Sequence, residues 1–162
     1  MDGVLFAMTG ASRAHNLIAT NLVAALRTHL RRGPCRLAAF DMKVRLAEGQ
    51  RYYYPDLVVS GNDPTDEADS YTETRPALLI EILSPSTEQT DRRAKLLAYQ
   101  ACPSVIDYLI VSQHEAHCQH FSRDDAGWLQ ASFGAGESVM LASTGLELDM
   151  AIVYEDVAFD RP

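Results

Sequence analysis

One carboxylate lies inside the most apolar segment of this sequence. Residues 77–83 read Ala-Leu-Leu-Ile-Glu-Ile-Leu, and Glu81 alone interrupts the apolar run. Such a run is typical of a strand that is covered on both faces of a sheet. An ionised carboxylate left unpaired there costs several kcal/mol or more. Glu81 therefore needs compensation, which an arginine, a bound proton, a bound cation or exposure at the strand end can provide.

A second acid, Asp56, directly precedes another apolar run, Leu57-Val58-Val59. We expect Asp56 and Glu81 to lie on neighbouring strands of one sheet, with their carboxylates converging. A helix carrying Lys95 follows the Glu81 strand. Carboxylate oxygens are the ligands that hard divalent cations prefer. The two acids with the lysine nearby therefore favour a metal site.

Size and charge limit the possible functions. The chain has 162 residues, 47% of them apolar, and this predicts one domain over residues 1–162. No apolar stretch approaches the about 20 residues of a membrane span, and the N-terminus lacks the features of a secretory signal, so we expect a cytoplasmic protein. The net charge of −8 argues against a nucleic-acid partner, yet residues 1–60 hold eight Lys/Arg against four Asp/Glu. Those basic residues could form a solvated helix face or a surface that follows phosphates.

Cysteines and histidines are the other side chains that could bind a metal. The chain has three cysteines, Cys35, Cys102 and Cys118. Because the number is odd and no two of them form a CxxC pair, we predict reduced, structural thiols. The cluster of His114, His117, Cys118 and His120 suggests zinc. On a strand, however, His117 faces away from Cys118 and His120, which disfavours a shared ion.

The first half of the chain predicts alternating strands and helices. Residues 5–8 are a strand candidate, and Ser12 can cap a long amphipathic helix that Gly33-Pro34 ends. Two strands are expected at residues 35–46 and 52–60, joined by a turn at residues 47–50. The acidic residues 61–76 have the composition of a long surface loop.

The second half predicts a crossover and a meander. After the Glu81 strand, residues 84–87 break the chain, and Ser86 with Gln89 can form a capping box. The next helix runs to Ala101, with an expected buried stripe of Ala94, Leu97, Ala98 and Ala101. Strands follow at 108–112, 117–122 and 128–133, with short edge elements at 134–148. This order predicts an α/β (α+β) fold with a mixed sheet flanked by helices.

Several of these segments together resemble a known family. They are YYPDLVV at residues 53–59, LIEILSPST at 79–87, DYLIV at 107–111, and the single residues Asp91, Lys95 and Tyr99. The set, with Asp2-Gly3, Ala7-Met8, His15 and Asn21-Leu22, resembles the Uma-two family of restriction endonucleases in the PD-(D/E)XK nuclease superfamily. From the family pattern we expect a helical segment before Asp2, which the given sequence does not include.

The resemblance implies a restriction endonuclease-like fold and Mg²⁺- or Mn²⁺-dependent hydrolysis of DNA by a homodimer. Asp56, Glu81 and the main-chain carbonyl of Ile82 would be the metal ligands. The superfamily lysine two residues after the glutamate is replaced here by Leu83. Lys95, on the helix that follows, would supply the missing charge.

Alternatives remain for these residues and for the function. Lys95 projects about 60° outside the expected apolar stripe and could instead be a solvated lysine paired with Asp91. His15 could support the metal ligands, or it could be an ordinary core or capping residue. Leu83 and the acidic net charge also suit a catalytically silent nuclease-fold module that binds nucleic acid or protein. A metal-dependent hydrolase of another phosphoester would share the same site.

Overall fold

A six-stranded mixed sheet forms the centre of the protein. The computed structural model describes residues 11–46, 51–61, 70–83 and 90–159. The strand order is β1-β4-β6-β7-β8-β9, and only the β6–β7 pair among these neighbours is parallel. The bounds are β1 (Cys35–Ala39), β4 (Leu57–Gly61), β6 (Pro76–Ile82), β7 (Asp107–Val111), β8 (His117–Asp124) and β9 (Gly127–Gly134). The mixed α/β sheet flanked by helices is as the sequence predicted.

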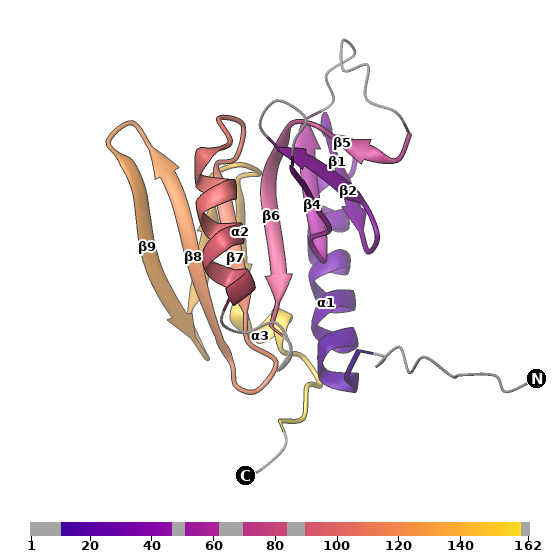
Figure 1. The fold of residues 1–162 in the computed structure, drawn as a ribbon. Helices are drawn as coiled ribbons and strands as arrows, with labels where there is room; N and C mark the ends of the chain where they lie inside the picture. The colour runs from indigo at the N-terminus through magenta and orange to yellow at the C-terminus, as the bar shows by residue number, and fades with distance from the viewer. Residues whose placement is uncertain (1–10, 47–50, 62–69, 84–89, 160–162) are drawn as a thin grey trace, which may run out of the picture.

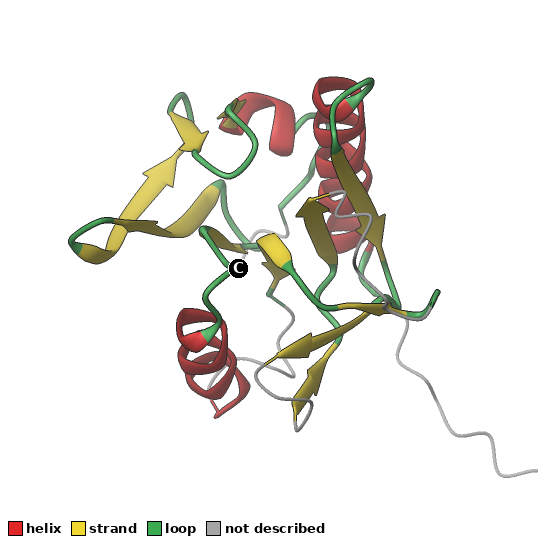
Figure 2. Ribbon diagram, turned by 90° about the horizontal axis from the view of Figure 1, so that it is seen from above, coloured by secondary structure: helices red, strands yellow, loops and turns green. Residues whose placement is uncertain are grey.

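Helices and two small sheets cover the faces of the central sheet (Figures 1 and 2). One face packs against α1 (Arg13–Leu30), the β10–β11 hairpin (Ser138–Leu141 and Leu146–Asp149) and α3 (Met150–Val153). The other packs against α2 (Thr90–Ala101) and a three-stranded sheet in the order β3-β2-β5. Strand β6 alternates between the two cores, with Leu78 and Ile80 in one and Leu79 in the other.

The long first helix and the crossover follow the sequence pattern closely. Ser12 caps α1 and accepts a hydrogen bond from the main-chain N–H of His15. Strands β6 and β7 are parallel and are connected through α2, as a strand-helix-strand crossover requires. The predicted antiparallel pair is β8 and β9. Three earlier expectations lie outside the described residues, namely the strand at 5–8, the turn at 47–50 and the capping box at Ser86 and Gln89.

The prediction of two long strands at residues 35–46 and 52–60 was wrong. The first is broken where Phe40 and Asp41 both take φ of 57°, so β1 lies in the central sheet and β2 (Lys43–Leu46) in the small one. The second is broken between β3 (Arg51–Tyr53) and β4. Pro55 has no main-chain N–H to donate to a ladder, so this break is where the chain passes between the two sheets.

The prediction of an irregular loop from 61 to 76 was also wrong at its end. Thr72–Glu73 forms strand β5, which pairs in parallel with β2, and both of its residues are buried. Pro76 already belongs to β6. The residue types of this acidic segment do not favour a strand. Strand β5 forms because it pairs with β2, which is far away in the sequence.

Helix α2 buries a different face from the one expected. Ala94, Leu97 and Ala101 are exposed and Ala98 is half-buried, whereas Tyr99 is fully buried. Lys95 lies on the buried side, with only 17% of its side chain exposed. The aromatic cluster under the helix and the carboxylate of Glu81 select this face, whereas the sequence pattern followed small apolar residues alone.

Candidate functional site

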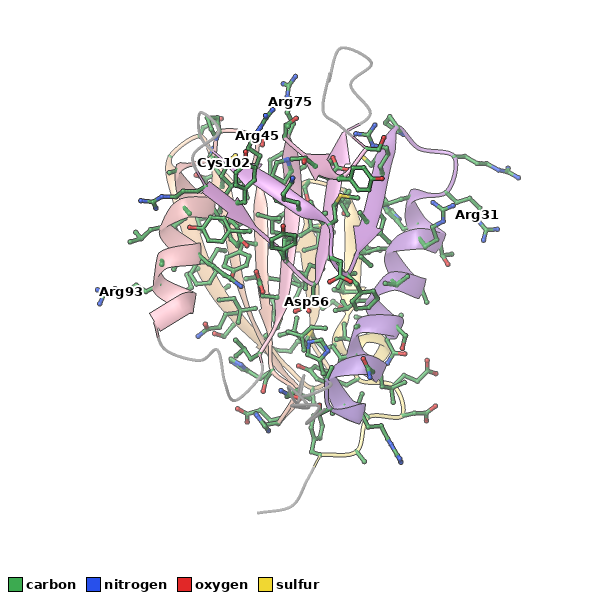
Figure 3. All side chains as sticks on the ribbon, turned by 45° about the vertical axis from the view of Figure 1, so that its right-hand side comes forward. Arg31, Arg45, Asp56, Arg75, Arg93 and Cys102 are labelled. Atoms are coloured by element: carbon green, nitrogen blue, oxygen red, sulfur yellow. The ribbon has the colours of Figure 1, made fainter. Side chains whose placement is uncertain are left out.

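Asp56 and Glu81 lie side by side at one end of the central sheet. Strands β4 and β6 are antiparallel with Leu57 opposite Ile80, so the residues just beyond this pair are neighbours. In Figure 3 Asp56 lies near the middle of the molecule, with α2 on one side and α1 on the other. Strands β4 and β6 are adjacent as predicted; Glu81 lies in β6, whereas Asp56 directly precedes β4 and does not belong to it.

Asp56 is held by three elements. Its Oδ2 accepts a hydrogen bond of 2.7 Å from the main-chain N–H of Ile82, and its Oδ1 lies 3.3 Å from Nε2 of His15 on α1. Its main-chain carbonyl accepts a hydrogen bond from the N–H of Phe40. The side chain is 22% exposed. Asp56 therefore joins the ends of β4 and β6 while keeping part of its carboxylate open to solvent.

Glu81 is compensated from α2. Tyr99 donates a hydrogen bond of 2.9 Å to Oε1, and Nζ of Lys95 lies 3.2 Å from both Oε1 and Oε2. Only 13% of the Glu81 side chain is exposed. An ammonium and a phenol therefore offset much of the burial cost of this carboxylate, and neither comes from β6 itself.

Burial and these neighbours have opposing effects on the pKa of Glu81. Burial raises its pKa from the ordinary 4.5 to about 6, while Lys95 and the Tyr99 hydrogen bond pull the pKa down and the charge of Asp56 pushes it up. Burial and the nearby Glu81 also raise the pKa of Tyr99 far above its usual range, so the phenol stays a donor. The site thus combines two acids and one ammonium at neutral pH.

A second layer of hydrogen bonds connects α1 with the end of β6. Ser12 Oγ donates to Oε1 of Gln113, and Nε2 of Gln113 donates to the carbonyl of Leu83 over 2.5 Å. Gln113 is buried. Neither Gln113 nor Ser12 was a predicted site residue, since their partners lie 30 and 101 residues away in sequence and no local motif marks them.

His15 and Lys95, but not Leu83, reach the two acids with polar atoms. His15 contacts Asp56 through Nε2, and its Nδ1 is buried without a hydrogen-bond partner among the described residues. Leu83 packs against the apolar core beside α2. The side chain of Asp91, the alternative partner of Lys95, lies outside the described residues.

The donor chemistry of the site suits a hard divalent cation. Two carboxylates and the main-chain carbonyl of Ile82 are all oxygen ligands. No group of three or more His, Cys, Asp or Glu side chains within the described ranges is arranged to hold a metal ion. A cation at this site would therefore depend on the two acids, a main-chain oxygen and water, which is the ligand set that Mg²⁺ commonly uses.

Two members of the suggested zinc cluster, His120 and Cys118, contact groups outside that cluster. His120 lies 2.7 Å from Oδ1 of the fully buried Asp107. Cys118 contacts Met150, and burial raises the pKa of its thiol to about 12. All three cysteines are free.

Among the described residues, no helix is long and apolar enough to cross a membrane.

Comparison with known proteins identifies the family of the chain. Residues 1–152 match the model of the Uma2 family, described as "Putative restriction endonuclease". The chain belongs to this family.

Two curated relatives and one solved structure extend the comparison. The uncharacterized proteins slr1290 and sll1609 of Synechocystis sp. are 35% and 30% identical to it, over 98% and 80% of this chain and 83% and 74% of their own lengths. A crystal structure of a putative nuclease belonging to DUF820 from Anabaena variabilis superposes with a TM-score of 0.75 at 16% identity. The match covers 91% of this chain and 84% of that one. The fold is therefore nuclease-like.

Proposed function

We propose that this protein is a divalent-metal-dependent endonuclease that hydrolyses phosphodiester bonds in DNA. The observation that carries the proposal is the juxtaposition of Asp56 and Glu81 at one sheet end, with Lys95 beside Glu81. Membership of a restriction endonuclease family and the nuclease-like fold support it. The same juxtaposition suits the ligand chemistry of Mg²⁺ or Mn²⁺.

Asp56, Glu81 and the carbonyl of Ile82 would hold the ion. When bound, such an ion activates water and offsets the charge that develops on the phosphate. The main-chain N–H of Ile82 and Nε2 of His15 fix the Asp56 carboxylate, so its orientation is set before substrate arrives. Tyr99 does the same for Glu81.

Lys95 would have two functions in this mechanism. In the substrate-free protein its ammonium stabilises the ionised form of Glu81. With a phosphodiester bound, the same ammonium would orient the attacking water or donate to a phosphate oxygen in the transition state. One well-placed donor of this kind is worth about 10² to 10³ in rate.

Cleavage of plasmid, linear duplex and single-stranded DNA in Mg²⁺ or Mn²⁺ tests the proposal. We expect wild type to cleave at least one form, Asp56→Asn and Glu81→Gln to lose activity, and Lys95→Met to lose about 10²- to 10³-fold. Arg93→Met is the matched control, because Arg93 is an exposed cation on the same helix. Unchanged cleavage by Lys95→Met would exclude its assigned role. No cleavage of any form by wild type would favour the silent binding module.

Three further expectations stay predictions. We propose that residues 1–162 form one domain, that the protein acts as a homodimer, and that it works in the cytoplasm. Sedimentation of the purified protein tests the dimer directly. A single monomeric species at micromolar concentration would contradict it.

A further inference from the structure

The small sheet of β2, β3 and β5 has two chemically different faces. Val44 and Leu46 are buried, and Tyr53 packs with them in the core beside α2. On the opposite side Arg45 is exposed and lies directly across from Tyr52. A basic residue of β2 therefore faces an aromatic residue of β3 on the outer face, while the inner face packs the small sheet against the core.

Exposed aromatic residues lie in the small sheet or close to its strands along the chain. Tyr52 is 50% exposed, Tyr54 59%, Tyr71 78% and Phe40 47%. All four lie in the strands of the small sheet or within three residues of them. Exposed rings at one place on a surface point to a binding site, whereas scattered ones need no explanation.

Positive charge accompanies the rings. Nζ of Lys43 lies 5.3 Å from the centre of the Tyr52 ring. Arg45 and Arg75 lie at the top of the view in Figure 3, whereas Arg31 lies at its right-hand edge. Asp41 is an exposed acid nearby, whereas Glu73 is buried and pairs with Arg36. Within the small sheet itself, the exposed charges are thus positive on a protein of net charge −8.

The strand that carries part of the outer face leads directly to the candidate metal site along the chain. Only Tyr54 and Pro55 separate β3 from Asp56. On the inner side, the Tyr53 ring packs edge-on against Tyr99 at 5.5 Å, and Tyr99 donates to Glu81. A polymer that lies along β3 toward its C-terminal end would therefore approach Asp56.

We propose that this outer face, formed by Lys43, Arg45, Tyr52 and Tyr54, binds single-stranded nucleic acid and leads it toward Asp56 and Glu81. Aromatic rings stack on bases whose faces are uncovered, and the basic side chains pair with the phosphates between them. A duplex covers those base faces, so it can use only the charges. The binding surface stands by itself, and only the delivery for cleavage rests on the proposed nuclease function.

Fluorescence anisotropy with a short labelled oligothymidylate in EDTA tests binding without cleavage. We expect tighter binding of this probe than of a duplex of equal length. Tyr52→Ala should weaken binding about 5-fold or more, and Tyr52→Phe, which keeps the ring, should bind like wild type. Arg45→Ala removes one cation that contacts phosphate. The slope of the logarithm of the binding constant against the logarithm of the salt concentration should therefore become shallower by about 0.7.

Control variants and folding checks distinguish loss of this binding face from a general loss of surface charge, apolar surface or stability. Leu129→Ala and Arg93→Ala remove an exposed apolar group and an exposed cation elsewhere, and both should bind like wild type. Each variant is first checked for a thermal midpoint equal to that of wild type. Equal binding of duplex and single strand, or no loss in Tyr52→Ala, would overturn the proposal. So would dissociation of a dimer by Tyr52→Ala, because the face would then be a protein interface.

The two proposals can fail separately. Tight oligothymidylate binding in EDTA with no cleavage in Mg²⁺ or Mn²⁺ would keep the single-strand surface and refute the nuclease. Unchanged cleavage of single-stranded DNA by Tyr52→Ala would keep the nuclease and refute delivery along this face, whereas unchanged oligothymidylate binding by the same variant would refute the surface itself.

Discussion

Burial of Glu81 predicts a specific pH dependence of stability in the metal-free protein. Its pKa is about 6 in the folded protein and near the ordinary 4.5 when the chain is unfolded. Below the unfolded pKa both states hold the proton, so burial of Glu81 has no ionisation cost. Between the two values the folded state keeps the proton that the unfolded state has lost, and stability falls as pH rises.

The size of this effect follows from the two pKa values. A difference of one pH unit corresponds to about 1.4 kcal/mol, so the interval from 4.5 to about 6 corresponds to about 2 kcal/mol. The stabilising contribution is fully present below about pH 4.5 and is lost once the pH has risen well past 6. Lys95 and Tyr99 limit the loss, because both favour the charged form.

Urea unfolding of wild type and Glu81→Gln in EDTA across this range measures the effect. Glutamine does not titrate, and most other groups cancel in the comparison. We expect the free energy of unfolding of wild type, relative to the variant, to fall by about 2 kcal/mol between acidic and neutral pH. A constant difference would refute the reasoning because Lys95 and Tyr99 would then balance burial, and a difference that rises with pH would refute it because they would outweigh burial.

Three other changes test the contacts around this site and on the sheet. Tyr99→Phe removes the hydrogen bond to Glu81 with little change of volume and should cost about 1 to 2 kcal/mol of stability at neutral pH in urea unfolding. Saturating Mg²⁺ should raise the thermal midpoint of wild type but not of Asp56→Asn, because a ligand of the folded state stabilises it by mass action. Asp107→Ala leaves His120 and a main-chain N–H without their buried acceptor and should cost at least about 2 kcal/mol in urea unfolding.

Exposed residues provide the controls for these three measurements. Arg93→Met on α2 and Asp125→Ala in the β8–β9 turn should each change stability by less than about 0.5 kcal/mol. Tyr99→Phe as stable as wild type would show that the phenol does not support Glu81. An equal Mg²⁺ shift in Asp56→Asn would place the ion elsewhere, and a stable Asp107→Ala would show that water replaces the lost acceptor.

The central strand and its acid were predictable because both signals are local. A continuous apolar run with one acid identifies β6, and the crossover through α2 places β7 beside it. The antiparallel neighbour β4 follows from the second apolar run. Hydrophobic pattern and connection rules therefore bring Asp56 and Glu81 together without any knowledge of distances.

The remaining parts of the site depend on contacts that the local pattern does not contain. Phe40 and Asp41 take positive φ without a glycine to signal it, so the split between β1 and β2 was missed. Gln113 is one polar residue after a buried strand, and its partners come from distant segments. Helix α2 shows a broader limit, because its buried face is chosen by Tyr99 and Lys95 rather than by the smaller apolar residues.

The position of Lys95 explains how the site can have leucine at position 83, where the superfamily has a lysine. Residues two apart on a strand point to the same face, so the side chain at position 83 leaves the sheet on the same side as Glu81. Leu83 packs there against the apolar core beside α2, where a lysine would have to displace apolar contacts. From the helix, Nζ of Lys95 instead reaches both oxygens of Glu81. The site therefore keeps one positive charge beside two negative ones without a lysine on the strand, and Leu83 by itself does not argue for a silent protein.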